Sequence, residues 1–326
     1  MADQDTVTNW LLDADPAIRW QVRRDLLDED AAAWAPERAR VETEGFGARL
    51  LAAQDPDGRW AGGAHFPADF VWGGDEPGQP WTSTSHALAQ LREFGLAPDT
   101  PTVHRMVELI GRNCRWEHDG QPYWDGEVEP CINGALVSNG VYFGVDMAPV
   151  VERLLGERLA DGGWNCEAER GSVRSSFDTT INVVEGLLAF EVATDDPAAS
   201  DAAREARVSG EEYLLARSLF RRLSTGEPAD ERYLSLLHPN RWHYDVLRAL
   251  DHFRAAGQAT GTPPDPRLAE AVAHVRARRR DDGMWPLDWN PMGRTWFDVD
   301  DGAGEPSRWL TLRALRVLRW WDSATG

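Results

Sequence analysis

Hydrophobic and polar positions follow a repeated order along the chain, and this order is clearest in residues 161–190. The segment opens with the turn DGGW at 161–164, where the glycines permit a positive φ and the tryptophan offers a large apolar side chain. Ser176 then stands where a helix N-cap is expected, and the residues after it are apolar at a helical spacing. The segment therefore predicts a turn after an outer helix, a polar loop and a capped inner helix.

The same order recurs in other parts of the chain. DGRW at 57–60 and DGMW at 282–285 match the turn, and DG at 119–120 matches it with Trp124 slightly displaced. Before DGMW there is room for one degenerate copy, which we assign to RLSTGE at 222–227. Self-similarity at intervals of several tens of residues is typical of repeated helical hairpins.

Helical periodicity and capping residues predict six inner and about six outer helices, with no strands. The inner helices are expected at 16–27, 82–94, from 131 onward, 177–190, 242–253 and 307–321. The outer helices are expected near 10–12 and at 36–53, 101–113, 149–160, 202–219 and 266–279. The connection at 61–80 is long for a loop, which predicts a lid or a cover over one end of the fold.

These elements predict an all-α fold with one domain over residues 1–326. The closed arrangement that we expect is an (α/α)6 toroid, with an inner ring, an outer ring and a central cavity. Closure into a ring is a step beyond what periodicity alone indicates. Gly134 and Gly140 lie inside an expected inner helix, where glycine weakens the helix and indicates close packing or a nearby ligand.

Composition excludes several classes of function. The formal net charge is −20, which argues against a nucleic-acid or anionic-membrane partner, because both are bound through positive potential. All 34 basic residues are arginine, so the chain has no lysine for a P-loop, a pyridoxal Schiff base or a general base. Three widely spaced cysteines do not indicate a disulfide framework. With no signal-peptide pattern and no membrane-spanning apolar run, we expect a cytoplasmic protein.

The DG-W turns, each followed by a helix that starts in a Ser/Thr/Asp-rich sequence, resemble the repeats of a known group of enzymes. These are the squalene-hopene cyclases, the class II terpene cyclases and the β subunits of protein prenyltransferases. The resemblance covers nearly all of the chain and implies the α/α toroid. It says less about chemistry, because these repeats occur in enzymes with quite different reactions.

Class II cyclases carry an Asp-x-Asp-Asp motif whose middle aspartic acid protonates an alkene or epoxide. The resemblance implies this role for Asp300 in Asp298-Val299-Asp300-Asp301, where Asp298 and Asp301 complete the motif. The alternative is an acidic, solvated loop, because five residues separate the motif from the helix expected at Ser307.

Asp178 is a second candidate for the acid, because it occupies the first turn of an expected inner helix. His243 would start the next inner helix, and a histidine that hydrogen-bonds the acid is also a feature of the family. A helix N-terminus lowers the pKa of a carboxyl group, so a proton donor there needs burial or a second acid to raise it. The alternative is an acid that only caps the helix.

A zinc site is another possibility. Prenyltransferase β subunits hold zinc with Asp-x-Cys and a histidine, and the resemblance implies a set made of Glu129, Cys131, His86 and His243. The alternative for Cys131 is a small buried side chain.

Other polar and aromatic residues near the expected starts of inner helices would face the cavity. They are Trp81, Asn133, Asn182, Arg241, Trp242, Tyr244, Asp245, Arg308 and Trp309. Aromatic faces can stabilise a carbocation, and arginines can bind a diphosphate or a carboxylate. A simple arginine-aspartate pair between two helix starts is the alternative.

The sequence therefore supports three hypotheses about function. The first is an enzyme that cyclises or isomerises an apolar, isoprenoid-type small molecule by protonation from an aspartic acid, with no cofactor. The second is a zinc-dependent enzyme, and the third is a toroid that binds a ligand or partner without catalysis. A homodimer would supply the second cavity wall that related cyclases obtain from a second domain.

Overall fold

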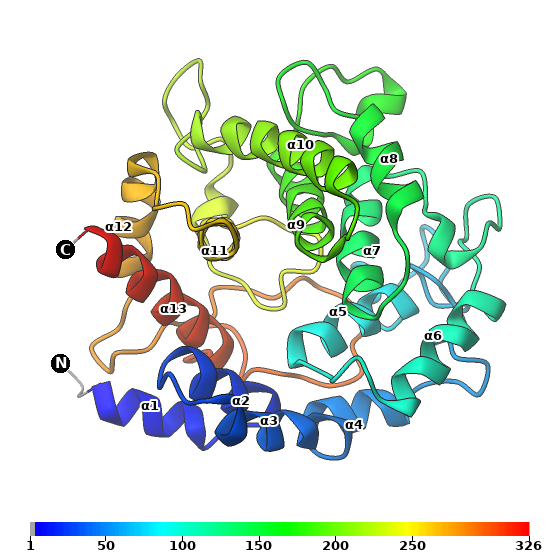
Figure 1. Cartoon of the computed structure of the whole chain (residues 1–326), viewed down its shortest axis with the longest axis horizontal. Helices are drawn as coiled ribbons and strands as arrows, with labels where there is room; N and C mark the ends of the chain where they lie inside the picture. Colours follow the sequence, from blue (N-terminus) through cyan, green and yellow to red (C-terminus); the bar gives the residue numbers. More distant parts are fainter. Residues whose placement is uncertain (1–3, 326) are drawn as a thin grey trace.

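The computed structural model describes residues 4–325, and in this part of the chain the protein is built from helices without any β-strand. The prediction of an all-α fold is thereby confirmed. Figure 1 shows the helices arranged around a central region, with the two ends of the chain on the same side of the molecule. No helix in residues 4–325 is long and apolar enough to cross a membrane.

Six helices surround the central region. They are α2 (Pro16–Asp25), α5 (Thr84–Phe94), α7 (Pro130–Tyr142), α9 (Phe177–Ala193), α11 (Val246–Thr260) and α13 (Arg308–Thr325). Each contacts the next in this order, and α13 contacts α2, so the contacts form a circuit. The remaining helices lie toward the outside in Figure 1. They are α1 (Gln4–Leu12), α3 (Ala31–Ala39), α4 (Gly45–Ala52), α6 (Pro101–Asn113), α8 (Ala148–Gly156), α10 (Pro197–Leu215) and α12 (Ala269–Ala277).

A buried tryptophan joins the outer helix to the turn in the three DG-W repeats. The indole N–H of Trp60 donates to the carbonyl of Leu50, ten residues earlier, at 2.8 Å. Trp164 and Trp285 make the same bond to carbonyls ten residues earlier, each at 2.7 Å. All three side chains are fully buried, so each turn is anchored by apolar burial and by a satisfied indole donor.

The same tryptophans also fix the start of the next inner helix. The backbone N–H of Trp60 donates to the hydroxyl of Thr84 at 3.1 Å. The equivalent bonds run from Trp164 to Thr180 at 3.1 Å and from Trp285 to Thr311 at 3.0 Å. Each hairpin of α4 and α5, α8 and α9, and α12 and α13 therefore has its inner helix tied to its turn.

The other two turns share a second geometry. Residues 115–122 and 221–228 each close through an isolated antiparallel bridge between an arginine and a proline seven residues later. The glycines in them, Gly120 and Gly226, both have a positive φ. RLSTGE therefore forms a turn at the expected place, but it matches the turn near 119–120 and not the DG-W type.

Close packing accounts for both glycines of α7 that the sequence singled out. A Cβ added at Gly140 would stand 2.2 Å from Sδ of Met147. A Cβ added at Gly134 would stand 2.4 Å from the carbonyl oxygen of Asn182 on α9. A Cβ added at Gly186 on α9 would stand at the same distance from the carbonyl oxygen of Gly134. The two helix backbones therefore approach so closely that neither position has room for a side chain.

Several expected helices were wrong in extent. The helix expected at 202–219 is α10, Pro197–Leu215, and the one expected at 149–160 ends at Gly156. The outer helix expected at 36–53 is α3 and α4 with a short 3-10 turn, Arg40–Glu42, between them. The inner helix expected from 242 begins at Val246, because Asp245 is extended and its side chain caps the N–H of Arg248. Residues 242–244 therefore belong to a loop and not to a helix.

Replacing Thr180 with valine tests the bond between turn and helix. The change keeps the shape of the side chain but leaves the buried N–H of Trp164 without an acceptor, so we expect the free energy of unfolding to fall by about 1–3 kcal/mol. Thr311→Val should cost a similar amount, and Thr102→Val, on the exposed face of α6, should change little. Chemical denaturation measures all three, and an unchanged stability in both buried variants would contradict this account.

Candidate functional site

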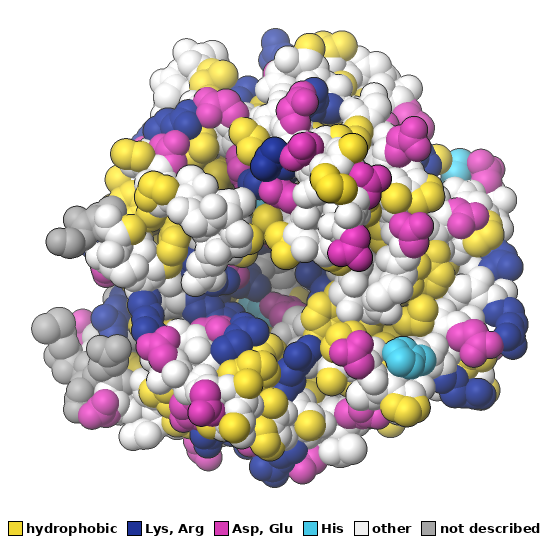
Figure 2. Space-filling view, viewed as in Figure 1, with side chains coloured by type: hydrophobic (Ala, Val, Ile, Leu, Met, Phe, Trp, Pro, Cys, Tyr) yellow, Lys and Arg dark blue, Asp and Glu magenta, His cyan; other side chains and the backbone are white. Residues whose placement is uncertain are grey.

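A central cavity of about 1520 Å³ is lined by side chains from all six helices of the circuit and from the loops at 65–79 and 239–242. Figure 2 shows the molecule hollowed near the middle of one face, with basic and acidic side chains at the rim. Aromatic and aliphatic side chains also line it, among them Phe66, Trp242 and Trp309. The cavity is thus large enough for a small molecule and is polar as well as apolar.

Most acids that the inner helices present to this cavity are neutralised by neighbours. Burial works against the charged form of Glu93, but His238 and Arg313 hold its pKa at about 2. Arg248 lowers the pKa of Glu185 against the effect of burial. Arg254 and Arg313 likewise lower the pKa of Asp251 against the effect of burial. These three groups are therefore carboxylates at neutral pH.

Asp178, in the first turn of α9, is the exception among the cavity acids of the inner helices. Its carboxyl group accepts the backbone N–H of Tyr244 at 2.8 Å and the hydroxyl of Tyr233 at 3.1 Å. No ion pair with it occurs in residues 4–325. Burial raises the pKa of Asp178, and the two hydrogen bonds oppose this effect only in part.

The loop that carries Tyr244 is held by α9 and α11. Asn182 donates to the carbonyls of Asp178 at 2.7 Å and Trp242 at 2.8 Å. Arg248 in turn donates to Asn182 at 2.9 Å and to the carbonyl of His243 at 2.9 Å. This network positions both the acid and the loop beside it.

His243 does not have the orienting role expected from the resemblance. Its ring stacks on Trp242 with centroids 3.7 Å apart, and Nδ1 lies 3.3 Å from the carbonyl of Asn240. Burial lowers the pKa of His243 to about 4. Among the described residues, the side chain that hydrogen-bonds Asp178 is Tyr233, which carries no signal of this role in the sequence because it lies outside the regular helices.

The Asp-x-Asp-Asp motif lies outside the central cavity. Asp298, Asp300 and Asp301 line a separate cavity of about 250 Å³, together with Arg308. Asp300 accepts the hydroxyl of Ser307 at 2.7 Å and lies 3.4 Å from Nδ1 of His238. The motif lies in an irregular segment before α13, which begins at Arg308. It is therefore not part of a helix start that would direct its side chains into the central cavity.

The residues expected to bind substrate divide into two groups. Asn182, Arg241, Trp242 and Trp309 line the central cavity. The others do not, and each has a structural contact of its own.

Those contacts show why the second group was misassigned to the cavity. Asn133 pins the backbone of Glu127 through bonds of 2.7 and 2.6 Å. Asp245 caps α11, and the hydroxyl of Tyr244 donates to Leu219 at 2.6 Å. The Trp81 indole donates to Met292 at 3.1 Å, and the Arg308 guanidinium covers the Trp10 ring at 4.7 Å.

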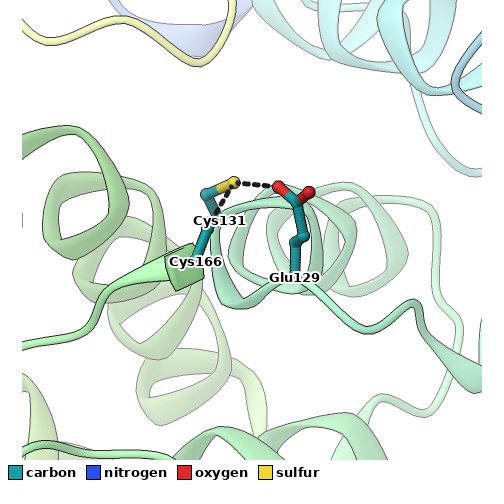
Figure 3. A group of neighbouring side chains, drawn as sticks. All are labelled: Glu129, Cys131 and Cys166. Atoms are coloured by element: carbon teal, nitrogen blue, oxygen red, sulfur yellow. Dashed lines mark hydrogen bonds between the residues drawn. The ribbon is translucent and has the colours of Figure 1, made fainter. Parts of the chain in front are cut away.

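A cluster of Glu129, Cys131 and Cys166 lies on the cavity wall (Figure 3). Cys131 Sγ is 2.8 Å from Cys166 Sγ and 3.6 Å from a carboxylate oxygen of Glu129. The sequence reasoning named Glu129 and Cys131 but missed Cys166, although it stands two residues after a DG-W turn.

The expected histidine ligands are elsewhere. Among the described residues, neither His86 nor His243 belongs to this cluster. His86 instead packs against His65, with ring centroids 4.8 Å apart. His86 lies on α5 and His243 in the loop before α11, whereas Cys131 lies on α7. The order of helix starts in the sequence does not reveal how far apart these side chains are.

No family model matches this chain, and no curated protein matches it.

Replacing His238 with glutamine gives a stability difference that depends on pH. Burial disfavours the imidazolium, but Glu93 and Asp300 outweigh burial and raise the pKa of His238 above 6.5. The ion pairs are therefore fully present below pH 6.5 and are lost as the pH rises through the folded-state pKa.

The free energy of unfolding of the wild type should exceed that of His238→Gln most at pH 6, and the gap should shrink toward pH 9. Urea denaturation across this range measures the gap. A gap that widens with pH would contradict a charged His238.

Proposed function

We propose that this protein is an enzyme that cyclises or isomerises a small, largely apolar molecule of isoprenoid type by protonating it from Asp178. In this proposal the circuit of six inner helices is an (α/α)6 toroid, and the reaction takes place in its central cavity. The single observation that carries the proposal is the state of Asp178. It is a partly buried cavity acid with a raised pKa and no ion pair among the described residues.

The contacts of Asp178 suit a proton donor. When the carboxyl group gives its proton to a substrate double bond, its O–H bond breaks and the π electrons of the double bond form a new C–H bond. A carbocation is left on the substrate and a carboxylate on Asp178. The carboxylate that remains is stabilised by the Tyr233 hydroxyl and the Tyr244 N–H, which are already in place. Return of a proton from a neighbouring substrate carbon to Asp178 completes an isomerisation.

The aromatic wall suits the cation that this step creates. Trp242 and Trp309 both line the cavity, and the face of an indole ring attracts a positive charge. The Trp242 indole is held by a bond of 3.2 Å to the side chain of Gln79, on the long loop over this end of the cavity. A salt bridge of Arg294 to Asp69 at 2.8 Å ties the same loop down.

Asp178→Asn tests the acid directly. The amide keeps the shape of the side chain and can still accept the Tyr244 N–H, while its NH2 donates to the Tyr233 oxygen. It has no acidic proton, so turnover should fall by about 10²–10⁴-fold. The measurement is mass spectrometry of products after incubation with squalene-like polyenes and isoprenoid diphosphates.

Glu167→Gln is the matched control, because Glu167 is an exposed acid at the cavity rim that pairs with Arg170. It should leave turnover unchanged. Full activity in Asp178→Asn together with loss of activity in Asp300→Asn would assign the acid to the other motif and contradict the proposal.

A second candidate function is metal-dependent catalysis, and the cluster of Glu129, Cys131 and Cys166 favours it. Two thiols and a carboxylate are a chemically suitable donor set for zinc and leave a fourth position for water or substrate. Two thiolates on one zinc ion stand about 3.8 Å apart, so the sulfurs, now 2.8 Å apart, would have to separate. Bound zinc would supply Lewis-acid chemistry at the cavity wall.

Elemental analysis of protein purified without added metal tests this candidate. The neighbouring Cys166, burial and Glu129 raise the pKa of Cys131, so metal binding should release protons. We expect about one zinc per chain, lost in Cys131→Ser and in Cys166→Ser. Cys114→Ser is the control, because Cys114 lies outside the cluster. Absence of metal, or retention in both serine variants, would exclude this second function.

A further inference from the structure

Among the described residues, one arginine of the cavity wall has no hydrogen-bond acceptor for its guanidinium group. The arginines that line the cavity are Arg24, Arg38, Arg92, Arg170, Arg241, Arg248, Arg313 and Arg316. In residues 4–325, seven of these guanidinium groups donate to a carboxylate, a carbonyl or another polar side chain. That of Arg241 donates to none, and the contact it makes is with the ring of Trp81, 5.5 Å away.

The acids near Arg241 do not compensate its charge. Glu93 is the carboxylate that acts on it, and Glu93 is already bonded to His238 at 3.1 Å and to Arg313 at 2.9 Å. Burial lowers the pKa of Arg241 to about 10, which still leaves it protonated at neutral pH. A desolvated cation without a counter-charge is unfavourable, so an anion in the cavity would find an attractive site here.

The backbone at Arg241 is also unusual. Its φ is +55°, in the left-handed region that residues with a side chain rarely adopt. Bonds on either side hold this conformation: the N–H of His243 donates to Asn240 at 2.8 Å, and Asn182 donates to the carbonyl of Trp242. Such conformations persist where the surroundings enforce them, which is common at binding sites.

Two neutral histidines and Gln79 lie near the guanidinium on the cavity wall. His86 contacts the same Trp81 ring at 4.9 Å and packs against His65. The Trp242 indole donates to Oε1 of Gln79, so Nε2 of Gln79 faces the histidines and donates to Nε2 of His65 at 3.0 Å.

This arrangement fixes the tautomer of His65. Burial lowers its pKa to about 4, so the ring is neutral, and because Nε2 accepts, the proton lies on Nδ1. In the part of the chain that the structure describes, Nδ1 is buried and has no acceptor. An unsatisfied buried donor is uncommon, and the His65 side chain belongs to the cavity wall.

We propose that Arg241, with the side chains of His65 and His86 near it on the cavity wall, forms a subsite for an oxyanion group of the ligand, a carboxylate or a phosphate. A guanidinium group presents two parallel N–H donors that match such a group. The inference rests on the proposed function, because it assumes that the central cavity holds a small molecule. It narrows the substrate class to molecules with one apolar part and one anionic end.

Three probes with the same alkyl chain separate the head group from the apolar part: dodecyl phosphate, dodecanoate and dodecanol. Binding is measured by calorimetry, below the micellar concentration of each probe, in the Asp178→Asn protein, which prevents turnover. We expect one of the two anions to bind at least about tenfold more tightly than dodecanol. The stronger of the two identifies the anionic group.

Arg241→Gln in the same background should abolish this preference and leave the affinity for dodecanol unchanged. Arg170→Gln is the matched control, because Arg170 is an exposed rim residue paired with Glu167, and the preference should persist in it. Arg241→Lys should keep a reduced preference, and it replaces the glutamine variant if that variant does not fold.

Equal affinities for all three probes, no binding of any probe, or an undiminished preference in Arg241→Gln would each overturn the subsite. These outcomes are distinct from failure of the proposed function, which would appear as full turnover in Asp178→Asn with the anion preference intact.

Discussion

The structure depends on one repeated contact, the buried turn tryptophan that bonds in two directions. Its indole N–H reaches back ten residues to the outer helix, and its backbone N–H reaches forward to a threonine in the first turn of the inner helix. In the second repeat of this kind these partners are Leu154 and Thr180, on either side of Trp164. Because both bonds are buried, the start of the inner helix has little freedom to shift. Asp178 lies two residues before Thr180 on the same helix, so this contact also fixes the position of Asp178.

The charges of the cavity follow from the same geometry. Acids on the inner helices pair with arginines of neighbouring helices across the wall, as Glu185 on α9 does with Arg248 on α11. Pairing removes such groups from chemistry, because each holds the other in its charged form. In residues 4–325, Asp178 is the inner-helix acid of the wall without an ion pair, and Arg241 is the arginine of the wall whose guanidinium group donates no hydrogen bond. A cavity with these two groups and an aromatic wall suits a ligand that is apolar along most of its length and charged at one end.

Sequence reasoning located the repeats because their turns combine glycines and a tryptophan at fixed offsets, and no tertiary information is needed to see that pattern. It located Asp178 for a related reason, since Ser176 marks the helix start. The sequence did not reveal the hydrogen-bond partners of Asp178, because Tyr233 lies 55 residues away in an irregular segment. The start of α11 was misjudged because residues 242–244 continue the helical pattern of side chains, while the extended backbone of Asp245 ends it. The Asp-x-Asp-Asp motif was wrongly expected at the central cavity, because a local sequence match carries no information about the direction in which its loop turns.

The claim on which the account depends is that Asp178 can carry a proton in the cavity under mild conditions. Difference infrared spectroscopy of the wild type against Asp178→Asn isolates the carboxyl band of this one residue, and a pH titration of the band gives its pKa. The account predicts a midpoint above the ordinary aspartate value of 3.8, because burial outweighs the two hydrogen bonds. A midpoint at or below 3.8 would show a carboxylate stabilised by its donors, and an acid role for Asp178 would then have no physical basis.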